Sequence, residues 1–187
     1  FNKYDKLTLF LSIIKAVRDM HDNNCCHADL KLENLVYYYD LKEKRKYVKL
    51  IDFDRVVKIS EGDNKYLNYT CGTQGYCSPE QYGNEKYVCL KSDIYSLGVI
   101  FLEILNEYEL WDTQYYNFNK YRISVLENLK KLKNDDLKIY KIIKKCLSKL
   151  PEKRYNIREL YNELAILIND YKLSQLLPLS QLSQLSQ

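Results

Sequence analysis

Apolar residues recur every three to four positions in several stretches of this chain, a pattern typical of helices that pack one face on a core. The first stretch is residues 6–22, for which Asp5 is a candidate N-cap. Its apolar face is formed by Leu7, Phe10, Leu11, Ile14 and Val17. Residues 91–105 carry the densest pattern, with apolar residues on nearly every side. This second helix is therefore expected to be buried nearly all round.

The second half of the chain predicts three more helices. They are expected at residues 123–132, 137–147 and from 155 or 156 to 170. Residues 107–119, which include Trp111, show no helical period and are expected to form a loop. The tail repeats Leu-Ser-Gln, a low-complexity pattern that predicts disorder. We therefore expect one folded unit over residues 1–172 and a disordered tail over residues 173–187.

Two short stretches predict strands instead. Residues 35–39 and 47–51 are rich in aromatic and β-branched side chains, and charged residues separate them. They predict a small hairpin. A hairpin brings Asn34, at its entry, close to Asp52, at its exit. Because Mg²⁺ accepts amide and carboxylate oxygens as ligands, this pair is a candidate magnesium site.

Composition indicates an ordinary globular chain and narrows the classes of function. A length of 187 residues is enough for one domain with a sizeable core, and 46% hydrophobic with 29% charged residues is a usual balance for such a domain. The net charge of +4 is mild and the basic run at residues 42–46 is short, so no nucleic-acid partner is expected. The most apolar run, residues 97–105, contains Glu103 and is too short to cross a bilayer, so no membrane partner is expected.

The six cysteines include no C-x-x-C pair and indicate a reducing compartment, so we expect a cytoplasmic location. One cluster in the sequence combines His21, Cys25, Cys26 and His27. Its spacing does not match the ligand spacing of zinc sites, which argues against a zinc centre there.

Residues 26–35, CHADLKLENL, carry the strongest chemical signal of the chain. Asp29 and Lys31 are two positions apart, so in an extended loop both side chains can point into one cleft. Asn34 follows closely enough to share a ligand with them. A carboxylate that accepts a hydroxyl proton, an ammonium that screens phosphate charge and an amide oxygen for a hard cation together suit a reaction on a phosphate.

The pattern His-x-Asp-x-Lys-x-x-Asn in this stretch resembles the catalytic loop of eukaryotic-type protein kinases. The resemblance runs from about residue 1 to about residue 170 and covers only the large C-terminal lobe of that family. Four other segments match further motifs in the order of the family. These are residues 48–54 (VKLIDFD) for the metal-binding Asp-Phe-Gly segment, 72–80 (GTQGYCSPE) for the end of the activation segment, 92–99 (SDIYSLGV) for the start of the central helix, and 151–154 (PEKR) for the turn that carries the arginine partner of position 80.

The resemblance implies a mainly α fold with one small β-hairpin and an activity that transfers the γ-phosphoryl group of ATP to a protein substrate. It implies that Asp29 orients or deprotonates the acceptor hydroxyl and that Lys31 binds ATP and stabilises the moving phosphoryl group. Asn34 and Asp52 would hold Mg²⁺. Thr73 resembles a threonine that hydrogen-bonds the aspartate and lysine in serine/threonine-directed members, and Lys31 agrees with that direction.

The resemblance also implies contacts that support the loop. Glu80 and Arg154 should form a buried ion pair that anchors the activation segment. Asp93, at the start of the central helix, should hold the backbone around His27. His27 and Phe53 should belong to a packed column that links the loop to the rest of the lobe.

Two positions depart from the family pattern. Ala28 stands where the family usually has an arginine that pairs with a phosphate on the activation segment, so control by phosphorylation through that pocket is not expected. Asp54 stands where the family usually has glycine, which tolerates backbone angles that aspartate adopts only at a cost. We expect Asp54 to stiffen the segment or to add negative charge near the metal.

No glycine-rich G-x-G loop precedes the catalytic loop, and the first residue is Phe1 while the single methionine is Met20. We therefore expect the N-terminal β lobe to be absent from this chain, the chain to be a fragment of a longer reading frame, and its independent kinase activity to be weak or nil. Two alternatives stay open. One is a pseudokinase or truncated lobe that acts as a binding or scaffold module, and the other is a small-molecule kinase.

Overall fold

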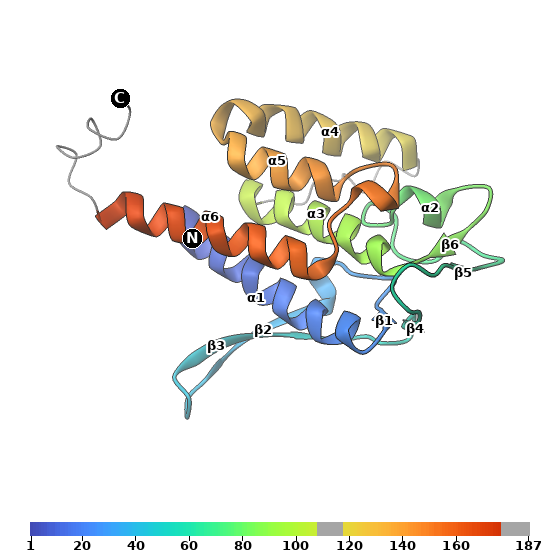
Figure 1. The fold of residues 1–187 in the computed structure, drawn as a ribbon, viewed down its shortest axis with the longest axis horizontal. Helices are drawn as coiled ribbons and strands as arrows, with labels where there is room; N and C mark the ends of the chain where they lie inside the picture. Colours follow the sequence, from blue (N-terminus) through green and yellow to red (C-terminus); the bar gives the residue numbers. More distant parts are fainter. Residues whose placement is uncertain (108–117, 177–187) are drawn as a thin grey trace.

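The computed structural model describes residues 1–107 and 118–176, and most of them lie in helices (Figure 1). The long helices are α1 (Lys3–Asp22), α3 (Leu90–Asn106), α4 (Phe118–Asp135), α5 (Leu137–Cys146) and α6 (Ile157–Leu176). The short ones are α2 (Pro79–Tyr82) and the 3-10 helices η1 (Leu32–Asn34) and η2 (Pro151–Lys153). The expected mainly α architecture is therefore confirmed.

Within the described ranges, the strands form three antiparallel pairs. The predicted hairpin is present as β2 (Leu35–Asp40) and β3 (Arg45–Leu50), and it projects from the helical body beside α1 (Figure 1). The other two pairs have only two residues a strand, too few for a periodic signal in the sequence. They are β1 (Cys25–Cys26) with β4 (Val57–Lys58), and β5 (Lys65–Tyr66) with β6 (Tyr87–Val88).

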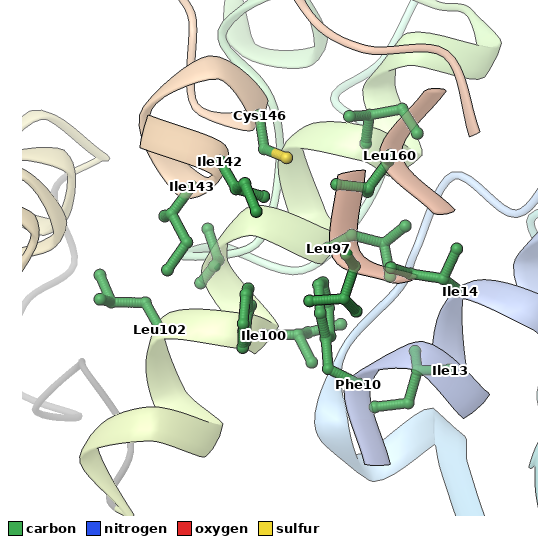
Figure 2. Packing of buried hydrophobic residues seen from close by; sticks show 14 of the residues in the cluster. Phe10, Ile13, Ile14, Leu97, Ile100, Leu102, Ile142, Ile143, Cys146 and Leu160 are labelled. Atoms are coloured by element: carbon green, nitrogen blue, oxygen red, sulfur yellow. The ribbon is translucent and has the colours of Figure 1, made fainter. Parts of the chain in front are cut away.

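Helix α3 is the centre of the core. All its residues from 92 to 103 are buried, which confirms the prediction of burial nearly all round. Side chains of α1 pack on one side of it and side chains of α5 on the other (Figure 2). Phe10 of α1 stacks on Phe101 of α3 with ring centroids 4.0 Å apart. Burial of this kind on both sides is the main stabilising contribution to such a fold.

Helix α1 begins earlier than its apolar pattern indicated. Asn2 is the N-cap and accepts a hydrogen bond from the Asp5 amide at 2.9 Å, while the Asp5 side chain accepts one from the Asn2 amide at 3.3 Å. The prediction of Asp5 as N-cap was therefore wrong. The two residues form a reciprocal capping box, in which Asp5 is the third helical residue. Of the predicted apolar face, all but the partly buried Leu11 are fully buried.

Helices α1 and α6 lie side by side and antiparallel (Figure 1). Tyr4 stacks on Tyr171 with centroids 6.4 Å apart, and the Arg18 guanidinium lies 4.8 Å from the ring centre of Tyr161. Helix α6 continues to Leu176, beyond the expected end at residue 170, so residues 173–176 of the expected tail are helical.

Two predictions fall wholly or partly outside the described ranges. Of the expected loop over 107–119, residues 108–117 with Trp111 lie outside them, and so do residues 177–187 of the expected tail. Helix α4 starts at Phe118, five residues before the predicted start at residue 123. Within the described ranges, no helix has both the length and the apolar character that crossing a bilayer requires.

Gly98 allows α3 to approach the end of α5. A Cβ at Gly98 would lie 2.8 Å from Cys146 Cβ and 3.1 Å from Leu147 Cδ2. Gly98→Ala is expected to lower the free energy of unfolding by about 1–2 kcal/mol, because overpacking costs more than the helix propensity of alanine returns. Urea denaturation measures this difference. An unfolding midpoint equal to or above that of the wild type would contradict the close approach.

Candidate active site

The backbone of the catalytic loop is held by Asp93, which lies in the first turn of α3 and is 1% exposed. Its carboxylate accepts hydrogen bonds from the amides of His27 at 2.8 Å and Ala28 at 2.9 Å, and it lies 2.9 Å from His21 Nε2. Burial alone would raise the pKa of Asp93, but these partners hold it below its ordinary value. The implied contact between Asp93 and the loop around His27 is confirmed.

Ala28 adopts a left-handed backbone conformation, with φ 64°. Such a conformation costs an alanine on the order of 1–2 kcal/mol, so the surroundings must enforce it. The amides of His27 and Ala28 bind one buried carboxylate, and the Ala28 carbonyl accepts a hydrogen bond from Gln81 Nε2 at 3.0 Å. Hydrogen bonds to the peptide groups before and after Ala28 thus fix this turn.

The Asp29 carboxylate is the centre of the site and is 9% exposed. Its Oδ1 atom accepts two hydrogen bonds from Thr73, one from the amide and one from the hydroxyl, both at 2.7 Å. The implied contact between Asp29 and Thr73 is therefore confirmed. Its other oxygen, Oδ2, lies 3.4 Å from Arg55 Nε. The carboxylate is held through one oxygen and offers the other toward a solvent-accessible side chain.

Asn34 lies directly beside Asp29. Its Nδ2 atom donates to the Asp29 carbonyl oxygen at 3.0 Å, so the amide oxygen Oδ1 is the atom available to a cation. Lys31 is half-buried and caps η1 on the same loop. Within the part of the chain that the structure describes, its ammonium makes no hydrogen bond or ion pair with Asp29.

The hairpin brings Asn34 and Asp52 to one end, as the sequence predicted. The Ile51 amide donates to the Asn34 carbonyl at 3.0 Å, and Leu35 pairs with Leu50 in the ladder. An amide oxygen and a carboxylate are the hard oxygen ligands that Mg²⁺ prefers, and Mg²⁺ commonly takes only one or two protein ligands beside phosphates. The donor set of this site therefore fits the ion. Among the described residues, no group of three or more His, Cys, Asp and Glu side chains is arranged to hold a metal ion.

The strained backbone of this segment lies at Asp52 and not at Asp54. Asp52 has φ 62°, whereas Asp54 is not among the described residues with positive φ. Aspartate at position 54 therefore adopts no left-handed backbone angles, and its effect on the stiffness and charge of the segment stays a prediction. The left-handed residue precedes Phe53 instead of following it, so no glycine is required at position 54.

His27 and Phe53 are in contact, with ring centroids 5.8 Å apart and planes inclined by 46°. The His27 ring is buried and its Nε2 atom lies 3.3 Å from the Ile51 carbonyl oxygen. Phe53 is 54% exposed. The implied column thus reaches the molecular surface at Phe53, next to the candidate metal residue Asp52.

Glu80 and Arg154 form the predicted buried ion pair. The two terminal guanidinium nitrogens of Arg154 donate to the Glu80 carboxylate at 2.7 Å. The Glu80 side chain is 3% exposed and the Arg154 side chain 0%. Ser92 Oγ also donates to Glu80, at 2.8 Å. Burial would raise the pKa of Glu80, but the hydrogen bonds and charge of Arg154 hold it below its ordinary value. This pair anchors α2 to the turn before α6.

Gln81 is a supporting residue that the sequence analysis missed. Its Nε2 atom donates to the carbonyls of Ala28 at 3.0 Å and Cys71 at 3.1 Å, and its Oε1 atom accepts from the amide and hydroxyl of Ser78, both at 2.9 Å. All these partners are buried, so the side chain joins the end of the activation segment to the catalytic loop. A glutamine beside Pro79 gives no local signal of such burial.

Arg55 was also missed as a site residue, because residues 55–71 read as a polar loop. The one available signal was its position directly after the Asp-Phe-Asp motif in a chain that lacks an arginine at position 28. Gly72 shows how closely the activation segment approaches the loop that carries Ala28. A Cβ at Gly72 would lie 2.7 Å from Cys77 Sγ and 2.9 Å from the Ala28 carbonyl oxygen, and φ is 95°.

Comparison with known proteins agrees with this geometry. Residues 1–164 match a family described as protein kinase domain. Serine/threonine-protein kinase KIN4 of Saccharomyces cerevisiae is 36% identical over 110 residues, which cover 58% of this chain and 13% of KIN4. Serine/threonine-protein kinase PSK2 of the same yeast is 26% identical over 161 residues, which cover 86% of this chain and 13% of PSK2.

A protein of Acanthamoeba polyphaga mimivirus is 30% identical over 167 residues, which cover 88% of this chain and 57% of that protein. The chain thus spans less than two thirds of the length of each of these three relatives.

Proposed function

The chain belongs to the protein kinase family, and on that premise we propose that it provides the large C-terminal lobe of a serine/threonine kinase. The reaction is transfer of the ATP γ-phosphoryl group to a hydroxyl of a protein substrate. The observation that carries the proposal is the Asp29 carboxylate, which is buried and fixed through Oδ1 by two bonds from Thr73. The carboxylate of a base held in this way is already oriented when the hydroxyl arrives.

In this mechanism each polar residue of the loop has one task. Asp29 Oδ2 orients the acceptor hydroxyl and takes its proton, while Lys31 stabilises negative charge on the moving phosphoryl group. Asn34 Oδ1 and Asp52 would hold Mg²⁺, which supplies charge neutralisation for the phosphates. Thr73 keeps Asp29 in place, and its presence beside the base supports the serine/threonine direction. The names of the yeast relatives support the same direction.

A reducing, cytoplasmic location is part of the proposal. All six cysteines are free thiols, and five of them are buried. Burial raises the pKa of Cys146 to about 12, which keeps that thiol in its unreactive form.

A second candidate function is a binding module without phosphotransfer. It is favoured by apolar side chains that are open to solvent next to the metal residues. Val36 and Ile51 are each 41% exposed and Phe53 is 54% exposed. A group of exposed apolar residues beside a polar site suits contact with another domain or protein.

The first test is the mass of the natural polypeptide in its source cell. A product heavier than 22.4 kDa by a small lobe supports the kinase, and a product near 22.4 kDa supports the binding module. Incubation of the natural protein with Mg²⁺, ATP and generic protein substrates is then expected to yield phosphoserine or phosphothreonine, and removal of Mg²⁺ by a chelator should stop it. The isolated 187 residues are expected to transfer phosphate weakly or not at all.

Two results contradict these expectations. Absence of transfer by the natural protein would overturn the kinase proposal. Efficient transfer by residues 1–187 alone would overturn the expectation that this lobe needs a further one.

A further inference from the structure

Arg55 places a cation against the candidate base, and the mechanism above gives it no task. Its Nε atom lies 3.4 Å from Asp29 Oδ2. The Asp29 side chain is 9% exposed, whereas the Arg55 side chain is 45% exposed. The guanidinium therefore contacts a nearly buried carboxylate and remains accessible to an anion from solvent.

Arg55 also interacts with Cys71, farther along the activation segment. The Cys71 side chain is the largest cause that raises the pKa of Arg55 above its ordinary value; partial burial opposes the rise, and the charge of Asp29 adds to it. Two residues after Cys71, Thr73 binds the other oxygen of Asp29. Arg55 and Thr73 thus contact the two oxygens of the same Asp29 carboxylate group.

Position 28 supplies no cation beside this group. Ala28 is 3% exposed and packs in a small apolar cluster with Cys26, Ile59, Cys71 and Val88. Among the ion pairs of the described residues, Arg55 is the one cation paired with Asp29. An anion that approaches the base from solvent therefore meets Arg55 and no arginine from the catalytic loop.

The position of the base determines how near a substrate comes to Arg55. An acceptor oxygen in hydrogen-bond contact with Asp29 Oδ2, at roughly 2.6–3.2 Å, lies within about 7 Å of Arg55 Nε, given the 3.4 Å contact. Neighbouring residues of an extended peptide are about 3.3 Å apart along the chain. The side chains one or two positions from the acceptor can therefore reach the guanidinium.

An anionic side chain at such a position has two effects. It can form a charge-assisted, bidentate contact with the guanidinium, the geometry that arginine favours for carboxylates and phosphates. It also draws Arg55 away from Asp29 Oδ2, the atom that has to meet the hydroxyl. A lysine or arginine at the same position would be repelled, and Arg55 would stay on the base.

We infer that Arg55 is a specificity-determining residue that selects protein substrates with an acidic or phosphorylated residue within two positions of the acceptor serine or threonine. The inference rests on the proposed phosphotransfer. It names the substrate class by its charge, and a carboxylate and a phosphate share the chemistry that Arg55 recognises.

The test uses the natural protein and a set of peptides that differ at one site. Each peptide has one acceptor serine, with glutamate, phosphoserine, glutamine or lysine at one of the four positions within two residues of it. At the responsive position, the wild type is expected to show a kcat/KM about tenfold higher for glutamate or phosphoserine than for glutamine, in line with one charge-assisted hydrogen bond. Arg55→Gln should remove this preference, and Arg55→Glu should invert it in favour of lysine.

Arg158→Glu is the matched control. Arg158 is an exposed arginine that pairs with Asp22 at 3.0 Å, at the junction of α1 and α6, and neither residue contacts Asp29. The same change of charge at this place should leave the peptide preference unaltered. A purely structural effect of substituting Arg55 would lower turnover of all peptides alike and would not exchange glutamate for lysine.

A binding measurement separates this inference from the kinase proposal. Fluorescence anisotropy without ATP is expected to show the glutamate peptide bound about tenfold more tightly than the lysine peptide by the wild type, and equally by Arg55→Gln. If no peptide is phosphorylated but this difference is present, the kinase proposal fails, and what stands is the recognition of anionic peptides by Arg55. Preference for phosphoserine alone or for both anions supports the inference. Equal binding of all peptides by the wild type, or an unchanged preference in Arg55→Glu, overturns it.

Discussion

Replacing Asp29 with asparagine is expected to lower the kcat of phosphotransfer by about 10²–10⁴-fold, the usual contribution of a general base. Asparagine has the same shape, and its amide oxygen can still accept the two bonds from Thr73. It cannot take a proton from the acceptor hydroxyl. The effect should therefore appear in kcat and leave the affinity for ATP nearly unchanged, as steady-state kinetics of the natural protein will show.

Asp19→Asn provides the control for this experiment. Asp19 is an exposed carboxylate on α1, and the same isosteric change there should leave kcat unaltered. Thermal unfolding of Asp29→Asn should follow that of the wild type closely, because the two bonds from Thr73 are kept and the lost ion pair with the half-exposed Arg55 contributes little. A kcat within threefold of the wild type would show that the acceptor hydroxyl does not depend on Asp29.

The helices were predictable where apolar residues recur at helical spacing along the chain. Helix α3 is apolar on nearly every side because it is surrounded by other elements, and burial of residues 92–103 follows from that composition. The ends of helices were less predictable. Asn2 and Asp5 are both suitable N-cap residues, and only the reciprocal bonds between them decide which one caps α1.

The candidate site was predictable where its residues are close in sequence. Asp29 and Asn34 lie on one loop, and a single hairpin brings Asp52 near them. Periodicity carries no information on contacts between distant segments. Arg55 on Asp29 and Gln81 on the Ala28 carbonyl are contacts of that kind, so the apolar pattern did not reveal them.

The structure shows what accompanies the alanine at position 28, which the resemblance to the family did not predict. With alanine there, the left-handed turn of the loop is fixed by Asp93 and Gln81, and the space beside it is filled by an apolar cluster. The charge near the base comes instead from Arg55. In this chain the loop of residues 26–35 therefore depends on residues 55–81 both for its packing and for the cation beside Asp29.

The anchor of that segment is the pair Glu80–Arg154, and its loss should have the largest effect on stability. Arg154→Met is expected to lower the free energy of unfolding by about 3–5 kcal/mol, because it leaves a buried carboxylate without its partner. Methionine keeps much of the length of the side chain, so the change is mainly one of charge and hydrogen bonds. Arg154 also donates to the carbonyls of Lys91 and Ser148, which would lose that donor. Urea denaturation at neutral pH measures the difference.

Arg158→Met is the control, because its ion pair with Asp22 is solvent-exposed. Surface pairs of this kind contribute about 0–1 kcal/mol, so the control should remain close to the wild type. A loss of stability in Arg158→Met equal to that in Arg154→Met would show that neither burial nor the bidentate geometry of Glu80–Arg154 matters.

The pH dependence of the same variant shows whether the unpaired carboxylate causes the loss. In the wild type, Arg154 helps to hold the pKa of Glu80 below its ordinary value, so the stabilisation by Glu80 is full above the unfolded pKa of about 4.3 and is lost as pH falls through the folded pKa. In Arg154→Met, burial acts without that opposing charge and raises the pKa of Glu80. The deficit of the variant should then be largest at neutral pH and should shrink as Glu80 takes up a proton.

A second substitution tests the same cause without a change of pH. Adding Glu80→Gln to Arg154→Met removes the buried charge, so the double variant should be more stable than Arg154→Met at neutral pH. A deficit that is independent of pH, together with no recovery in the double variant, would mean that lost packing around Arg154 destabilises the protein. Recovery in both measurements would identify the charge of Glu80 as the reason that the activation segment needs an arginine buried beneath it.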